Sequence, residues 1–194
     1  YCDFYKTVNL SLTSKFISAL QGEVIQRKNY LDNECVETIY FGGGTPSVLN
    51  ESELAEILDF LHLHFNVSPS VEITFEANPD DLSVEYLNKI YRAGIRRLSI
   101  GIQSFQNEVL KKMNRWNDAI QAVEAVENAA DTGFNDISVD LIYGLPGLTR
   151  EQWKADLTRV FQLPVQHLSA YHLTYHEGTP FYTWLQKGTL KQLK

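Results

Sequence analysis

Short apolar runs alternate with longer amphipathic stretches along most of this 194-residue chain. Short runs bounded by turn residues predict strands, and longer stretches with a period near 3.6 predict helices. The predicted strands are 37–41, 71–75, 97–101, 137–142 and 167–172; the predicted helices are 14–30, 51–64, 84–93, 107–113, 117–132 and 150–163. Repeated strand–helix units require parallel strands with right-handed crossovers, so the predicted fold class is α/β.

Several helix boundaries carry their own capping residues. Asn50 and Ser83 stand where N-caps belong, and Gly133 follows the predicted end of a helix. Thr149 has a glutamine three positions later, which is the pattern of a capping box. These local signals agree with the periodicity.

Polar residues follow every predicted strand, and they bear on the choice between an open sheet and a barrel. All loops converge at a barrel mouth, whereas an open sheet gathers ligands mainly at its switch point, so this distribution favours a (β/α) barrel. A long helix near the N-terminus has no strand before it, so we expect a partial barrel that lacks its first strand. The polar residues are Gly43, Thr45, Glu76, Asn78, Gln103, Ser104, Asp140, Tyr171 and Tyr175.

Composition excludes several classes of protein. The formal net charge of -7 and the absence of basic clusters argue against a nucleic-acid partner. The chain has no run of about eighteen apolar residues and no basic-then-apolar leader, so we expect a cytoplasmic protein. Cys2 and Cys35 are its only cysteines, which predicts free thiols rather than a disulfide framework.

Three consecutive glycines, Gly42 to Gly44, directly follow the first predicted strand. Glycine permits positive φ angles and close approach of the backbone to a ligand. Thr45 and Pro46 come next, so the segment matches neither a Walker loop nor a dinucleotide fingerprint. A tight structural turn remains the alternative to a ligand loop.

Four further polar residues are candidates for the same site. Glu76 could accept hydrogen bonds from hydroxyl groups or act as a base, and Gln103 offers a donor and an acceptor together. Arg115, between two helical stretches, could hold a carboxylate bidentately, unless it is simply solvated. Asp140 lies within an apolar strand, where a carboxylate is costly without partners. A paired core aspartate and an exposed strand-end glutamate are the structural alternatives.

Five segments together resemble the radical S-adenosylmethionine (SAM) proteins of the oxygen-independent coproporphyrinogen III oxidase family, and within it the heme-chaperone branch, HemW. The segments are 1–4, 41–47, 76–79, 99–105 and 140–147. The resemblance implies a partial (β/α)6 TIM-like barrel with a [4Fe-4S] cluster on C-x-x-x-C-x-x-C and SAM on the unique iron. Cys2 matches the last of these cysteines. The first two, and the preceding strand, are absent from the sequence, so 1–194 is expected to be an incomplete radical SAM core domain without its C-terminal domain.

The same resemblance assigns roles to individual residues. It places Gly43, Gly44 and Thr45 at the methionyl end of SAM and Arg115 at its carboxylate. It places Glu76, Gln103 and Asp140 near the ribose and neighbouring polar atoms, and Ile142 beside adenine. Cys35 matches no ligand position and is expected to be structural.

The resemblance also implies a function in heme or porphyrin metabolism. No further cysteine follows Cys2 closely, as in HemW-like proteins, which favours a heme chaperone that binds heme, SAM and a cluster. The alternative is an oxygen-independent coproporphyrinogen III oxidase that decarboxylates its substrate, and whether the protein is an enzyme stays open. Implied partners are heme or a porphyrinogen, an electron donor and respiratory heme acceptors.

Overall fold

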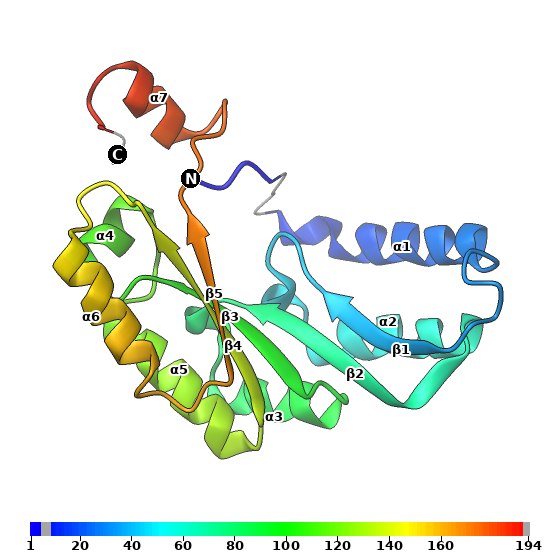
Figure 1. Cartoon of the computed structure of the whole chain (residues 1–194). Helices are drawn as coiled ribbons and strands as arrows, with labels where there is room; N and C mark the ends of the chain where they lie inside the picture. The colour runs from blue at the N-terminus through cyan, green and yellow to red at the C-terminus, as the bar shows by residue number, and fades with distance from the viewer. Residues whose placement is uncertain (5–8, 192–194) are drawn as a thin grey trace.

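Five parallel strands form one curled sheet in the computed structural model, which describes residues 1–4 and 9–191. They are β1 (Val36–Phe41), β2 (Val67–Ala77), β3 (Arg97–Gln103), β4 (Asp136–Tyr143) and β5 (His167–His172). Their order in the sheet is their order in the sequence, and every neighbouring pair is parallel. The sheet curves into a half-barrel, so the predicted α/β partial barrel is confirmed (Figure 1).

Seven α-helices connect or flank these strands in the described residues. They are α1 (Thr13–Arg27), α2 (Glu51–His64), α3 (Val84–Arg92), α4 (Asn107–Lys112), α5 (Ala119–Thr132), α6 (Arg150–Val160) and α7 (Pro180–Gln186). Asn50, Ser83 and Thr149 cap α2, α3 and α6 as predicted, and Gly133 ends α5 in the left-handed conformation. In the part of the chain that the structure describes, no helix is long and apolar enough to cross a membrane.

Some predicted boundaries were wrong, each for a local reason. Helix α1 ends at Arg27, because the following segment turns through Asp32 and Asn33 with φ angles of 47° and 63°. Strand β2 begins earlier than predicted, although Pro69 in that stretch argues against a strand. Helix α5 begins after Asp118, whose side chain accepts from two backbone amides. The short helix α7 was not predicted.

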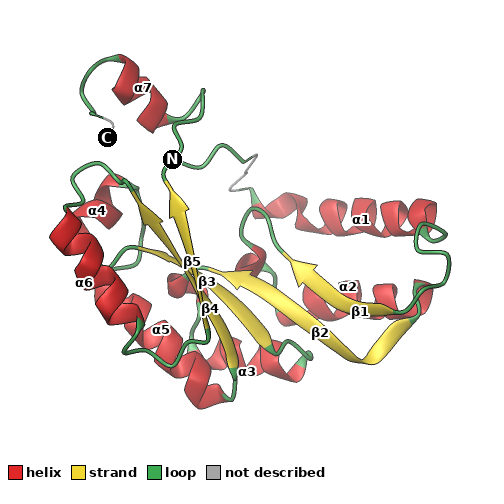
Figure 2. Ribbon diagram, in the orientation of Figure 1, coloured by secondary structure: helices red, strands yellow, loops and turns green. Residues whose placement is uncertain are grey.

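The strands bury one face under helices and turn a polar face inward. On β3, Leu98, Ile100 and Ile102 are fully buried, together with apolar side chains of α2, α3, α5 and α6. Because side chains alternate along a strand, Arg97, Ser99 and the following alternate positions face the opposite side. Figure 2 shows α5 and α6 on the outer side of the curve. The core therefore lies outside the sheet, and the concave side stays polar.

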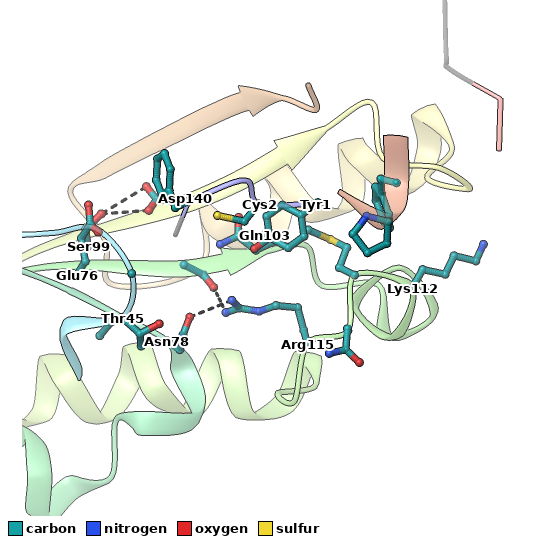
Figure 3. A pocket seen from close by; sticks show the side chains of 18 of the residues that line it. Tyr1, Cys2, Thr45, Glu76, Asn78, Ser99, Gln103, Lys112, Arg115 and Asp140 are labelled. Atoms are coloured by element: carbon teal, nitrogen blue, oxygen red, sulfur yellow. Dashed lines mark hydrogen bonds between the residues drawn. The ribbon is translucent and has the colours of Figure 1, made fainter. Parts of the chain in front are cut away.

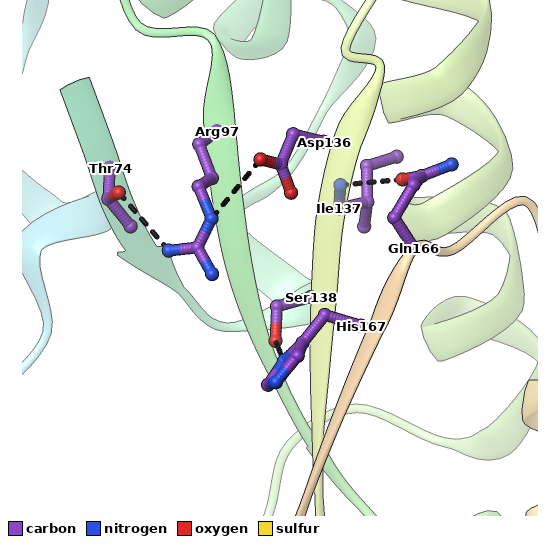
Figure 4. Close-up of polar contacts among 7 residues, drawn as sticks. All are labelled: Thr74, Arg97, Asp136, Ile137, Ser138, Gln166 and His167. Carbon is purple, nitrogen blue, oxygen red and sulfur yellow. Dashed lines mark hydrogen bonds and ion pairs between the residues drawn. The ribbon is translucent and has the colours of Figure 1, made fainter. Parts of the chain in front are cut away.

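At the amino ends of β3, β4 and β5, the polar side chains on this face contact one another (Figure 4). Arg97 donates to Thr74 Oγ1 on β2 at 3.2 Å, and its Nε lies 3.3 Å from Asp136 Oδ2 on β4. Ser138 Oγ lies 2.8 Å from His167 Nδ1. All of these contacts join side chains on adjacent strands.

Candidate functional site

A cavity of about 640 Å³ lies at the carboxyl ends of the strands (Figure 3). Its volume is within the range of small-molecule sites. Seven residues singled out from the sequence line it, coming from the N-terminal segment, the loop after β1, the ends of β2, β3 and β4, and the loop after α4. They are Cys2, Gly44, Thr45, Glu76, Gln103, Arg115 and Asp140.

The glycine loop is fastened to the end of β2 through one carboxylate. The Gly43 N–H donates to Glu76 Oε2 at 3.0 Å, and the Tyr40 hydroxyl donates to Glu76 Oε1 at 2.7 Å. Gly43 and Gly44 have φ angles of 78° and 56°, which glycine adopts without strain. A Cβ at Gly42 would lie 2.5 Å from the Tyr40 ring, so the close approach of loop and ring requires glycine there.

Two donors thus fix the rotation of the Glu76 carboxylate. Partial burial, and then the hydrogen bond to Glu76, raise the pKa of Tyr40 to about 12, so its hydroxyl remains a donor at neutral pH. A carboxylate has about four acceptor positions, and these two bonds use two of them. Glu76 can therefore still accept from a ligand that brings hydroxyl or ammonium groups.

The end of β3 departs from regular strand geometry at Gln103. The pairing with β4 shifts register between Gly101 and Gln103, and Gln103 has a φ of 71°. A non-glycine residue in this left-handed region costs on the order of 1 kcal/mol, and such strain is often found at functional sites. The Gln103 amide folds back over Gly101, where an added Cβ would lie 2.7 Å from Nε2.

A carboxylate on α6 holds the loop that follows Gln103. Asp156 is fully buried and accepts from Ser104 Oγ at 2.7 Å, Phe105 N at 3.2 Å and Gln106 Nε2 at 2.8 Å. Sequence reasoning missed Asp156, because an aspartate inside an amphipathic helix has no signal of its own. Its contacts hold residues 104–106, which directly follow Gln103, and Asp156 itself does not line the cavity.

Arg115 spreads its guanidinium over protein acceptors. It donates to Asn78 Oδ1 at 2.9 Å, to the Gly101 carbonyl at 2.5 Å and to Asn117 Oδ1 at 3.3 Å. Burial raises the pKa of Tyr1, while the charge of Arg115 and a side-chain hydrogen bond from it oppose the rise, so Arg115 also contacts Tyr1. Arg115 therefore joins the end of β3 to the residue that follows β2. The sequence had suggested only that Arg115 could bind a carboxylate, and it gave no sign of these contacts within the protein.

Asp140 accepts hydrogen bonds from Ser99 Oγ, at 3.2 Å to Oδ2 and 3.4 Å to Oδ1. Burial raises the pKa of Asp140, while hydrogen bonds from Ser169 and Ser99 oppose the rise. Ser99 lines the cavity but was not singled out beforehand. Its even spacing from Gly101 and Gln103 on β3 was the available signal.

Two of the candidate residues do not line this cavity. Ile142 is buried in a cluster with Val109 and Leu145. Gly43 lines a separate cavity beside α1 and α2, and its N–H donates to Glu76, which does line the polar cavity. Sequence reasoning also missed the aromatic side chains of α7 that line the opposite wall, because it did not predict that helix.

The family model described as the radical SAM superfamily matches residues 1–160. The chain belongs to the radical SAM superfamily. It is 36% identical over 191 residues to the heme chaperone HemW of Lactococcus lactis, covering 98% of this chain and 50% of that protein. It is 35% identical over 192 residues to HemW of Bacillus subtilis, covering 98% of this chain and 51% of the relative. It thus spans about half the length of these relatives.

The fold agrees with that membership. Coproporphyrinogen III oxidase (HemN) from Escherichia coli, described as a radical SAM enzyme, superposes with a TM-score of 0.86 at 27% identity, covering 98% of this chain and 45% of that chain. Membership in the superfamily implies the use of SAM and a [4Fe-4S] cluster.

The side chains around the cavity fit SAM better than they fit a [4Fe-4S] cluster. Glu76 and Asp140 present carboxylate oxygens and Arg115 a positive charge, which suits a ligand with hydroxyl, ammonium and carboxylate groups such as SAM. A cluster requires several thiolates, whereas Cys2 lines the cavity and Cys35 is exposed and lies outside its lining. Among residues 1–4 and 9–191, no three His, Cys, Asp or Glu side chains are grouped to hold a metal ion.

Proposed function

We propose that residues 1–194 form the radical SAM core of a heme-handling protein of the HemW type. The observation that carries the proposal is the polar wall at the strand ends, in which Gly43 and Tyr40 fix Glu76 beside Asp140, Gln103 and Arg115. The similarity to HemW proteins over nearly the whole chain supports it.

In this proposal, each part of the polar wall receives a different part of SAM. Gly44 and Thr45 meet the methionyl end of SAM, and Arg115 meets its carboxylate. Glu76, Gln103 and Asp140 lie near the ribose hydroxyls and accept hydrogen bonds from them. Bound SAM would supply radical chemistry in the whole protein, and the residues named here would bind and orient it.

A heme titration of the full-length protein tests the chaperone function. We expect a saturable change in the absorption spectrum on adding heme, and no conversion of coproporphyrinogen III under anaerobic conditions with SAM and a reductant present. Conversion of coproporphyrinogen III would instead support the alternative, an oxygen-independent coproporphyrinogen III oxidase. Absence of saturable heme binding would overturn the chaperone proposal. The proposed partners also include an electron donor and a respiratory heme acceptor. The proposed location of the protein is the cytoplasm.

A further inference from the structure

A histidine and an aspartate lie at opposite corners of a small polar patch on β4 and β5. In the register of these two strands, Ser138 is paired with His167, and Asp140 is paired with Ser169. Side chains two positions apart on a strand share a face, so all four belong to the concave side of the sheet. Each pair therefore joins one titratable group to one serine, and the two titratable groups lie diagonally across the patch.

Hydrogen bonds hold both pairs of the patch. Ser138 Oγ lies 2.8 Å from His167 Nδ1 (Figure 4). Asp140 accepts from Ser169 on β5 and from Ser99 on β3, the latter at 3.2 Å to Oδ2. Ser99 and Ser138 are buried, and a buried hydroxyl keeps its hydrogen-bond partner. The positions of His167 and Asp140 are therefore fixed relative to each other.

The diagonal is short enough for a charge to act across it. Neighbouring strands lie about 4.8 Å apart and rise about 3.3 Å per residue, which puts the backbones of His167 and Asp140 about 8 Å apart. This separation is about one Debye length at physiological salt, so solvent weakens the interaction without removing it. Burial and the charge of Glu76 raise the pKa of Asp140, whereas its serine hydrogen bonds and the charge of His167 lower that pKa.

The other charged groups on the concave side do not replace His167. Arg97 Nε lies 3.3 Å from Asp136 Oδ2, so its charge is largely compensated. Among the described residues, His167 is the cationic group whose charge lowers the pKa of Asp140. The titratable groups of the sheet on this side are Tyr40 on β1, Glu76 on β2, Arg97 on β3, Asp136 on β4 and His167 and Tyr171 on β5. Those of the cavity lining outside the sheet are Tyr1, Cys2, Lys112 and Arg115.

We propose that His167 is a positioning residue for the ligand site: its imidazolium keeps Asp140 ionised, so that the carboxylate accepts hydrogen bonds from a hydroxyl-bearing ligand. This inference rests on the proposed function, under which that ligand is SAM and Asp140 lies near its ribose. His167 does not line the cavity, so it acts through Asp140 and not by contact with the ligand. Histidine side chains generally become charged below about pH 6.5, so the effect belongs to mildly acidic conditions.

The test measures the SAM affinity of the full-length protein between about pH 5.5 and pH 8, on either side of the usual histidine titration. His167→Gln removes the charge but keeps a group that can hydrogen-bond to Ser138. We expect unchanged affinity at the upper pH and about a threefold loss at the lower pH, the size of a solvent-screened charge interaction. His167→Lys stays charged throughout and should retain the affinity at the lower pH. A purely structural role of His167 would not depend on pH in this way.

Two further variants decide whether the effect passes through Asp140. In Asp140→Asn the carboxylate is gone, so adding His167→Gln should cause no further loss at either pH. His172→Gln is the matched control, because His172 lies on the opposite face of β5, outside the cavity lining, and its replacement should leave the pH profile unchanged.

Three outcomes would overturn the inference while SAM binding itself persists. They are an unaltered pH profile in His167→Gln, a further loss in the double variant, and a gain of affinity at low pH in His167→Gln. The gain would mean that the imidazolium repels the cationic ligand directly. Failure of the unaltered full-length protein to bind SAM would instead overturn the proposed SAM site.

Discussion

The two ends of the same strands carry similar polar side chains and use them differently. At the amino ends, Arg97, Asp136, Ser138 and His167 contact one another across neighbouring strands and Arg97 also reaches Thr74. At the carboxyl ends, polar groups surround a cavity of about 640 Å³ and keep acceptor positions free. In barrels of this type, the amino ends generally contribute stability and the carboxyl ends contribute chemistry.

The largest contrast between the two ends should come from their aspartates. Asp156→Ala leaves three donors at the carboxyl end without an acceptor, which we expect to lower the free energy of unfolding by about 3 kcal/mol. Asp136→Ala removes a half-exposed ion pair at the amino end and should cost less than about 1 kcal/mol. Urea denaturation of the two variants measures the contrast. Equal losses would show that Asp156 does not organise the loop after β3.

A second contrast separates stability from binding. Gly101→Ala places a Cβ 2.7 Å from the Gln103 amide, so the amide must move. We expect SAM affinity of the full-length protein to fall about tenfold, equivalent to the loss of one hydrogen bond. Gly22→Ala, in α1 with nothing within 4 Å of the added Cβ, should leave affinity unchanged and raise stability by about 0.5–1 kcal/mol. Equilibrium binding and thermal denaturation report the two effects, and unchanged affinity in Gly101→Ala would remove Gln103 from the site.

A smaller effect should follow from releasing the Glu76 carboxylate. Tyr40→Phe removes one of its two donors, and we expect about a threefold loss of SAM affinity with little change in the melting temperature. Tyr30→Phe is the matched control, because that ring is 77% exposed and lies outside the cavity. A loss of stability equal to the loss of binding would indicate that Tyr40 only supports the fold.

The smallest effect is a change in the free energy of unfolding, which should have opposite signs for aspartates at the two ends of the strands. Burial raises the pKa of Asp140, so the folded protein holds this proton more tightly than the unfolded chain does. Stability from this group is therefore present at low pH and is lost as pH rises from the ordinary carboxyl pKa through the raised one. Asp140→Asn should stabilise the protein slightly near neutral pH, whereas Asp136→Asn should destabilise it by weakening the contact with Arg97. Denaturation curves at several pH values show the signs.

The sequence predicted the succession of strands and helices, because periodicity and capping act locally, and seven of its nine candidate residues line the cavity. The strand ends that carry Glu76, Gln103 and Asp140 converge as parallel strands require. Contacts between distant segments left no comparable signal. Asp156 reaches the β3 loop from α6, and Arg115 reaches Asn78 and the Gly101 carbonyl. The aromatic side chains of α7 that line the cavity were missed because the seven residues of this helix are too few for a periodic pattern.

The contacts of Asp156 have a consequence for how this site can change during evolution. The loop that follows Gln103 is held by a helix residue that lies outside the cavity, through Ser104 and Gln106. A substitution at Ser104 or Asp156 alone leaves a buried donor or acceptor without a partner, and the cost falls on the whole fold. Positions 104 and 156 should therefore covary among homologues, even where the ligand changes.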